Sequence, residues 1–173
     1  MTLLYDKEKV QQSINDLRRQ LHEIKVEVLP GGTLPVKAHA TDAGFDLFAI
    51  EDIIIFPGQV IRHPLNIKLT LPASTYMSVE SKSGLGAKGL LVFGGVIDEG
   101  YRGVISAVIS NIRSRDDEGN LLDIDAAKIT VKKGQKLAQM IPFPFSTAYY
   151  ITQVDKVNTN TDRSAGGFGS SGV

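Results

Sequence analysis

Residues 60–71, VIRHPLNIKLTL, point to the fold class because β-branched residues recur through them. Three further runs share this character: IKVEVL (24–29) and GVISAVISNI (103–112) alternate, and IEDIIIF (50–56) is again β-branched. Turn-forming residues bound the runs, for example PGG at 30–32 and DDEGN at 116–120. About ten or more short strands at this spacing predict an all-β sandwich or barrel. No second helix is expected in residues 25–157, and KLAQM (136–140) is predicted to be a strand.

One amphipathic helix is predicted at the start of the chain, over residues 6–24, which contain neither Gly nor Pro. Its larger apolar residues follow a heptad seam with spacings of four, three, four and three: Val10, Ile14, Leu17, Leu21 and Ile24. A helix of this length is marginal alone in water, so the seam must be buried somewhere. Two arrangements remain open, packing on the chain's own domain and a short coiled coil between subunits.

The chain therefore divides into an N-terminal helix (1–24), a β domain (25–157) and a tail (158–173). The tail, NTNTDRSAGGFGSSGV, has few apolar residues and is expected to be flexible in the free protein. Arg163 and Phe168 stand alone among Gly and Ser, where an arginine suits phosphate and an aromatic ring suits stacking. A frayed end with no role has the same composition.

Composition excludes several classes of function. The 173 residues contain no Cys, which excludes disulfides, a Cys nucleophile, iron–sulfur clusters and thiolate zinc sites. The three His are not at metal-ligand spacing, and 19 basic residues balance 19 acidic ones, so no broad basic surface for nucleic acid is expected. Neither a secretory signal nor a membrane-spanning apolar run is evident. A single-domain, soluble, cytoplasmic protein is expected.

Three polar segments contain the residues suited to binding or chemistry. SKSGLGAKG (81–89) places Lys82 and Ser83 beside Gly84, which suits a phosphate, although a surface turn has the same composition. GGVIDEGYRG (94–103) ends an apolar run at Asp98, which is either a general base for a water or the start of a hairpin turn. HATDAGFDL (39–47) carries acids, and Mg²⁺ is the cation that suits them. Together these segments indicate phosphoryl chemistry.

Five segments resemble, in order, the five motifs of the trimeric dUTPase family. They are AHATDAGFDLFA (38–49), SKSG (81–84), GVIDEGYRG (95–103), KGQKLAQM (133–140) and RSAGGFGSSG (163–172). The resemblance implies a jelly-roll, β-clip-type subunit of a homotrimer with active sites at subunit interfaces. It also implies Mg²⁺-assisted hydrolysis of dUTP to dUMP and pyrophosphate, which limits uracil incorporation into DNA and supplies dUMP for dTMP synthesis. A threefold particle would also bring three N-terminal helices together.

The resemblance also assigns roles to matching residues. Asp98 would deprotonate the water that attacks the α-phosphorus, and Tyr101 would lie under the deoxyribose and exclude a 2′-hydroxyl. Arg163 would bind the γ-phosphate, and Phe168 would stack over the uracil as the tail closes. Asp46 would contact the hydration shell of Mg²⁺. The remaining substrate-binding residues would read the uracil through their backbone, hold phosphates or line the site: Gly95, Val96, Ile97, Ser106, Lys82, Ser83, Gly84, Gln139 and Gly169.

Two departures from the family motifs concern phosphate binding. Motif two normally has Arg where this chain has Lys82, and motif four commonly reads Gly-Asp-Arg where residues 134–136 are Gly-Gln-Lys. Lysine lacks the planar two-point contact of arginine. The related dCTP deaminases are disfavoured because their catalytic Arg and Glu positions hold Ala87 and Val108 here. The alternative from another class is a dUTPase-like protein that acts mainly by binding a regulatory protein, as some phage members do.

Overall fold

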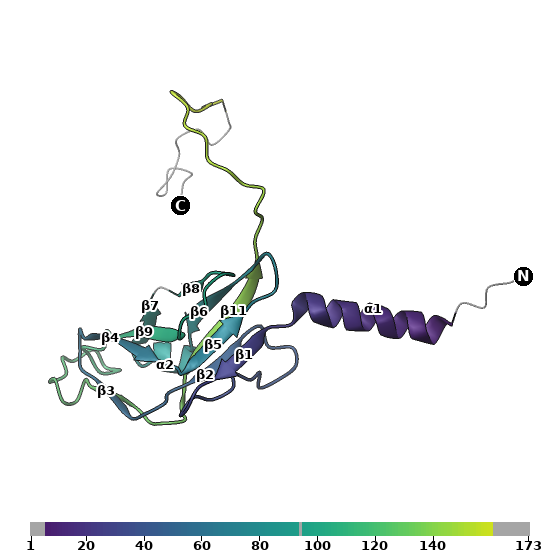
Figure 1. Ribbon diagram of the computed structural model, residues 1–173. Helices are drawn as coiled ribbons and strands as arrows, with labels where there is room; N and C mark the ends of the chain where they lie inside the picture. Colours follow the sequence, from purple (N-terminus) through teal and green to yellow (C-terminus); the bar gives the residue numbers. More distant parts are fainter. Residues whose placement is uncertain (1–5, 94, 161–173) are drawn as a thin grey trace, which may run out of the picture.

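The computed structural model describes residues 6–93 and 95–160. A β body carries a long helix that projects from one side and an extended arm that leaves it in another direction (Figure 1). The helix is α1 (Lys7–His22), and α2 (Ser83–Gly86) is a single turn. The strands are β1 (Lys25–Val28), β2 (Phe45–Phe48), β3 (Ile53–Ile55), β4 (Val60–Pro64), β5 (Ile67–Thr70), β6 (Thr75–Ser81), β7 (Leu90–Phe93), β8 (Val96–Ile97), β9 (Ser106–Asn111), β10 (Ile129–Val131) and β11 (Lys136–Pro144). This succession of short strands confirms the all-β prediction, including the strand expected at 136–140.

The described residues form four small sheets whose paired strands run antiparallel. The largest has the order β2-β11-β6-β8, the next has the order β4-β9-β7, and the others pair β1 with β5 and β10 with β3. Because β11 lies between β2 and β6, Gln139 is opposite Asp46 on one side and opposite Glu80 on the other. Segments that are far apart in sequence thereby lie on adjacent strands.

The core lies where the sheets face one another, and the strand period decides which side chains enter it. In β3, Ile53 and Ile55 are buried while Ile54 between them is 53% exposed, the period-two pattern of a strand with one buried face. A polar residue, His63, is also buried, and its Nε2 accepts a hydrogen bond from the backbone N–H of Ile50 at 3.2 Å. Burial lowers the pKa of His63, because the charged imidazolium is poorly solvated there.

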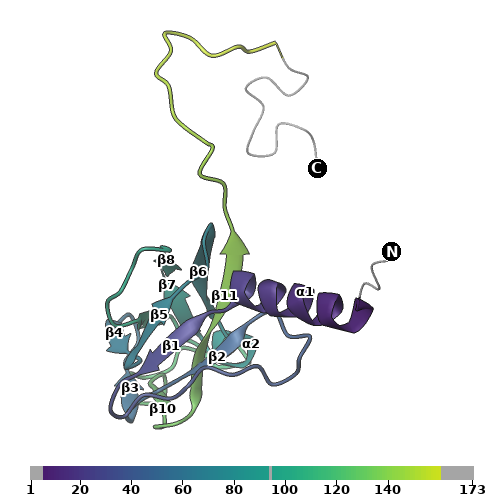
Figure 2. The ribbon, with the colours of Figure 1, turned by 45° about the vertical axis from the view of Figure 1, so that its right-hand side comes forward.

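Helix α1 confirms the predicted N-terminal helix. Of the two predicted arrangements, packing of the helix on the chain's own domain is not observed. Its first turn is capped by Asp6, whose side chain accepts a hydrogen bond from the backbone N–H of Lys9 at 3.3 Å. In both views the helix extends away from the β body (Figures 1 and 2). The four seam residues on α1 are therefore not packed on the chain's own domain, whereas Ile24, which follows the helix, packs against the core. Within the part of the chain that the structure describes, no helix is long and apolar enough to cross a membrane.

The expectation of no second helix in residues 25–157 is wrong by one turn. After β6, the carbonyl oxygen of Lys82 accepts hydrogen bonds from the N–H groups of Leu85 at 3.1 Å and Gly86 at 2.8 Å, which closes α2. Leu85 is buried beneath this turn while Ser83 and Gly84 stay exposed. The single buried leucine anchors a turn that is too short to leave a helical period in the sequence.

The chain leaves the body just after β11. Phe145 still donates its N–H to the carbonyl oxygen of Ser74 at 2.9 Å, and residues 146–160 then run away from the body as an extended arm (Figures 1 and 2). Tyr149, Tyr150 and Ile151 on this arm are almost fully exposed. The packed body thus ends near residue 145, earlier than the predicted boundary at 157, and most of the predicted tail lies outside the described residues.

Candidate active site

A surface pocket gathers the candidates from residues 95–106. It lies between β4, β8, β9 and the loop 98–105, and its lining consists of Arg62, Gly95, Val96, Ile97, Asp98, Tyr101, Val104, Ile105 and Ser106. Asp98 follows β8 directly, and its carbonyl oxygen accepts the N–H of Tyr101 at 3.0 Å, which closes a tight turn. The buried Ile97 fixes the strand while the Asp98 side chain is exposed at the pocket. The arrangement presents an exposed carboxylate beside a cleft.

Two glycines shape this pocket. A Cβ on Gly103 would lie 2.3 Å from the hydroxyl oxygen of Tyr101, so only glycine leaves room for the ring in its present place. That hydroxyl donates a hydrogen bond to the carbonyl oxygen of Val104 at 3.3 Å. Gly95 has a φ of 149°, and a Cβ there would lie 2.9 Å from the carbonyl oxygen of Val79 on β6. Gly103 therefore makes room for the Tyr101 ring, and Gly95 for the backbone of β6.

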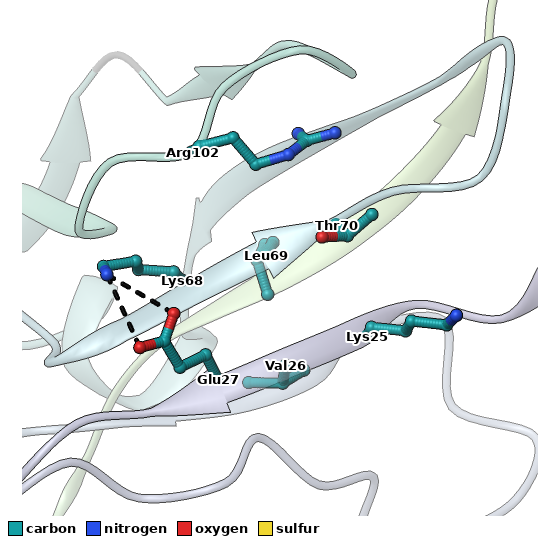
Figure 3. A pocket seen from close by; sticks show the side chains of 7 residues that line it. All are labelled: Lys25, Val26, Glu27, Lys68, Leu69, Thr70 and Arg102. Carbon is teal, nitrogen blue, oxygen red and sulfur yellow. Dashed lines mark hydrogen bonds and ion pairs between the residues drawn. The ribbon is translucent and has the colours of Figure 1, made fainter.

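The loop that carries Asp98 and Tyr101 is braced from its other side by Arg102. The guanidinium of Arg102 donates to the carbonyl oxygens of Glu99 at 2.7 Å and Tyr101 at 2.9 Å. Figure 3 shows Arg102 beside Leu69 and Thr70, in a second groove over β1 and β5 where Glu27 pairs with Lys68. Consecutive side chains of one motif thus point to different surfaces, Tyr101 to the first pocket and Arg102 to this groove.

A second cluster of candidates forms where β2, β11 and β6 lie side by side. Asp46 is only 4% exposed, and each of its carboxylate oxygens accepts a hydrogen bond from a lysine. Lys82 binds Oδ1, and the Nζ of Lys136 lies 2.7 Å from Oδ2. Burial alone would raise the pKa of Asp46, but the hydrogen bonds from Lys136 and Lys82 outweigh burial and hold the pKa below its usual range.

Gln139 completes this cluster from the middle strand. Its side-chain amide donates to the carbonyl oxygen of Ser81 at 3.1 Å, one residue before Lys82. A Cβ on Gly44 would lie 2.7 Å from Oε1 of Gln139, so the glycine makes room for this side chain. With the exposed Ser83 and Gly84 of α2, the cluster offers two ammonium groups, an amide and a hydroxyl, which are donors suited to phosphate oxygens.

The residues around Asp46, as they stand, do not fit a metal site. Both of its carboxylate oxygens are engaged by the ammonium groups of Lys82 and Lys136, whose charges oppose a further cation. In the described ranges, no group of three or more Asp, Glu or His side chains is placed to hold a metal ion. Mg²⁺ usually retains several waters and binds through substrate phosphates with one or two carboxylates. The predicted contact between Asp46 and hydrated Mg²⁺ stays a prediction that requires a lysine to move.

The predicted site residues thus fall into two groups. The first group lines the pocket: Gly95, Val96, Ile97, Asp98, Tyr101 and Ser106. The second group lies on or next to the paired strands β2, β11 and β6: Asp46, Lys82, Ser83, Gly84 and Gln139. The pocket lining, drawn from the described residues, includes no member of the second group. Arg163, Phe168 and Gly169 lie outside the described residues.

Sequence reasoning missed two charged residues at these groups. Arg62 lines the pocket, and its Nε donates to the hydroxyl oxygen of Ser106 at 3.3 Å. Nothing in the run VIRHP distinguishes this arginine from any polar strand residue. Lys136 was visible only as a departure from motif four, and its contact with Asp46 depends on the pairing of β11 with β2.

Comparisons with known proteins agree on one family. The family model described as dUTPase matches residues 31–172. The deoxyuridine 5'-triphosphate nucleotidohydrolase of Alkaliphilus metalliredigens is 38% identical over 143 residues, which are 81% of this chain and 90% of that protein. The protein of the same name from Clostridium kluyveri is 39% identical over 143 residues, again 81% of this chain and 90% of the relative.

Solved structures match the fold. The dUTPase of Staphylococcus bacteriophage 80alpha with dUpNHpp, from work on phage dUTPases that control transfer of virulence genes, has a TM-score of 0.74 at 26% identity, covering 87% of this chain and 99% of that one. A dUTPase mutant of phage phi11 of S. aureus, solved to reveal coordination of a structural Mg(II) ion, has a TM-score of 0.64 at 26% identity, covering 78% and 97%. These matches confirm the predicted jelly-roll fold class.

Proposed function

The chain belongs to the dUTPase family, and we propose that it hydrolyses dUTP to dUMP and pyrophosphate. The observation that carries the proposal is the pocket in which the exposed Asp98 carboxylate stands beside Tyr101, Gly95 and Ser106. The pocket offers a base, an aromatic ring and backbone groups within one cleft. Those are the parts needed to hold a nucleoside and activate a water next to its phosphates.

Asp98 is the general base of the proposed reaction. It takes one proton from a water whose oxygen forms a bond to the α-phosphorus, while the bond from that phosphorus to the α,β-bridging oxygen breaks. The bridging oxygen leaves with pyrophosphate, and dUMP keeps the new oxygen. The turn closed by the Tyr101 N–H fixes the Asp98 backbone, so the carboxylate needs little reorganisation to meet the water.

Tyr101 and the walls around it set the proposed substrate selectivity. The hydroxyl contact with Val104 and the absence of a Cβ on Gly103 hold the ring in place, so a sugar stacked on it has no space for a 2′-hydroxyl. The backbone groups of Gly95 and Ser106 offer donors and acceptors to the edge of a uracil. A base that is bulkier at its 5-position does not fit a cleft with fixed backbone walls.

The Asp46 cluster is the proposed phosphate site. Lys82, Ser83, Gly84 and Gln139 are the predicted phosphate ligands, and we add Lys136, because its ammonium group shares Asp46 with Lys82. Two lysines against one carboxylate leave a net positive charge next to α2. That excess charge favours a triphosphate, which carries about four negative charges.

The proposed active site is shared between subunits of a homotrimer. Among the described residues of one chain, the pocket and the phosphate cluster have no lining residue in common, and the arm of residues 146–160 runs away from its own body (Figure 2). The segment that follows this arm contains Arg163, Phe168 and Gly169. We infer that this segment closes over a neighbour's nucleotide.

Pyrophosphate release from dUTP, dTTP, dCTP and UTP, measured side by side with Mg²⁺ present, tests the proposed function. Rapid release from dUTP with little from the other three is expected. Comparable rates with UTP would contradict the role of Tyr101, and comparable rates with dTTP would contradict a narrow base cleft. No release from any nucleotide by the intact protein would refute the enzyme assignment.

A regulatory binding role is the second candidate. The likeness to the phage 80alpha dUTPase, which belongs to a group described as controlling transfer of virulence genes, favours it. A protein that acts only by binding does not need the base, so Asp98→Asn would leave its partner binding and its biological effect unchanged. Loss of dUTP hydrolysis with every other property retained would separate the two functions.

A further inference from the structure

The seam of α1 is an apolar surface without a partner in the described chain. Four apolar side chains of the seam are 37% to 66% exposed: Val10, Ile14, Leu17 and Leu21. The helix instead points outward in both views (Figures 1 and 2). An isolated helix of 16 residues with such a seam is marginal in water, so the seam requires a second surface to hold the helix.

We propose that α1 associates with the same helix of two other copies of this chain, as a parallel three-stranded coiled coil. The proposal rests on the homotrimer of the proposed function, because a threefold axis relates three equivalent helices that leave their bodies in the same sense. The seam repeats with the four-three spacing that a left-handed coiled coil requires. Its positions are occupied by Val, Ile and Leu alone.

The residues that flank the seam permit this association. In a parallel arrangement Ser13 of one helix faces Arg18 of the next, and Gln11 lies on the same side as Arg18. No like charges are opposed among these three positions. Toward the outside, Gln12 donates a hydrogen bond to Asp16 at 3.0 Å, which supports the helix on the face that remains in water.

The charge distribution disfavours a membrane surface as the occupant. Helices that lie on anionic bilayers carry mainly Lys and Arg on their polar face. The first turn of α1 instead mixes signs, with Lys7, Glu8 and Lys9 in succession, and Asp16 follows on the outer face. The seam is also narrow, which suits the interface of a coiled coil more than burial in lipid.

The connection between α1 and the β body is short. Only Glu23 and Ile24 separate α1 from β1, and Ile24, the last position of the seam, packs against the core. The helix therefore starts from a fixed point on each subunit. Once the β bodies assemble, the helices meet at an effective concentration in the millimolar range, which allows so short a seam to associate.

Disulfide trapping tests the proposal with little background because the chain contains no Cys. Leu17→Cys places one thiol on the seam, and Gln12→Cys places one on the outer face as the matched control. On mild oxidation of the full-length protein, Leu17→Cys is expected to join two of the three chains in each particle. The yield should not change on dilution, since the reacting thiols belong to one particle. Gln12→Cys should stay monomeric on a non-reducing gel.

The same samples separate this inference from the proposed function. dUTP hydrolysis and the mass of the particle are measured before oxidation, and both variants should match the parent. A trimer that hydrolyses dUTP but traps Leu17→Cys no better than Gln12→Cys overturns the coiled coil and leaves the enzyme assignment standing. A parent that is not a trimer, or whose α1 binds phosphatidylglycerol vesicles instead, also overturns it. Absent hydrolysis refutes the proposed function independently.

Discussion

Replacing Asp46 by Asn should destabilise the protein through the two lysines it leaves behind. Removing one partner of a buried ion pair costs about 3–5 kcal/mol in the free energy of unfolding. Here the Asp46 side chain is 6% exposed, but the Lys82 and Lys136 side chains are 28% and 47% exposed and can be solvated after the change. We therefore expect a loss of about 2–3 kcal/mol, which is below the range for a fully buried pair and within the range for one hydrogen bond to a charged group.

Urea unfolding at one fixed protein concentration measures this loss as a shift in midpoint with an unchanged m value. The matched control is Asp125→Asn, because Asp125 pairs with Lys128 at 3.2 Å while its side chain is 77% exposed. A surface pair of this kind contributes less than about 1 kcal/mol. Equal destabilisation by the two variants would refute the reasoning, since burial would then not matter.

The pH dependence of the same comparison has a definite sign. The pKa of Asp46 is lowered in the folded protein, so its contribution is fully present above the pKa of the unfolded chain and is lost as pH falls through the folded pKa. The gap between the parent and Asp46→Asn should be constant at neutral pH and should narrow below about pH 4. A gap that stays the same at low pH would mean that the charge of Asp46 is not its source.

Three further substitutions test the site directly. Asp98→Asn should lower kcat for dUTP by about 10²–10⁴-fold with KM little changed, and a rate within a few-fold of the parent would remove Asp98 as the base. Lys82→Arg should lower KM by about three- to tenfold through two-point binding, whereas Lys128→Arg, a surface control, should not change it. Gly103→Ala should displace the Tyr101 ring and reduce the preference in kcat/KM for dUTP over UTP, while an unchanged preference would contradict the packing argument.

Local pattern was sufficient to predict that the body is built of strands, but not the single helical turn α2. Alternation and β-branching mark strands because one face of each small sheet packs on the core, as Ile53 and Ile55 do on either side of the exposed Ile54. Even Pro64 within β4 agrees with a strand, because β4 is at the edge of its sheet, where a missing N–H does little harm. The setting of α1 was not predictable, since a heptad seam specifies an apolar partner without saying whose it is.

Contacts that depend on strand pairing could not be predicted from the sequence. Arg62 meets Ser106 because β4 pairs with β9 in the register that places Pro64 opposite Ser106. Such a register joins positions 44 residues apart and leaves no trace in either segment. The residues that were predicted to share a pocket are instead close in sequence. They lie on β8, on β9 and on the loop between these strands, so one short segment of the chain brings them together.

The two departures from the family's phosphate motifs are best understood as a single change. Lys82 and Lys136 lie 54 positions apart in sequence by their numbering, yet they bind the two oxygens of the same carboxylate, Asp46. An arginine at position 82 could bind both oxygens of Asp46 through its planar fork, whereas a lysine binds one. Lysine at 82 takes only one, which leaves Oδ2 for Lys136. Lys82→Arg therefore also shows which group takes the fork: a lower KM means that the fork binds phosphate, and an unchanged KM means that Asp46 holds it.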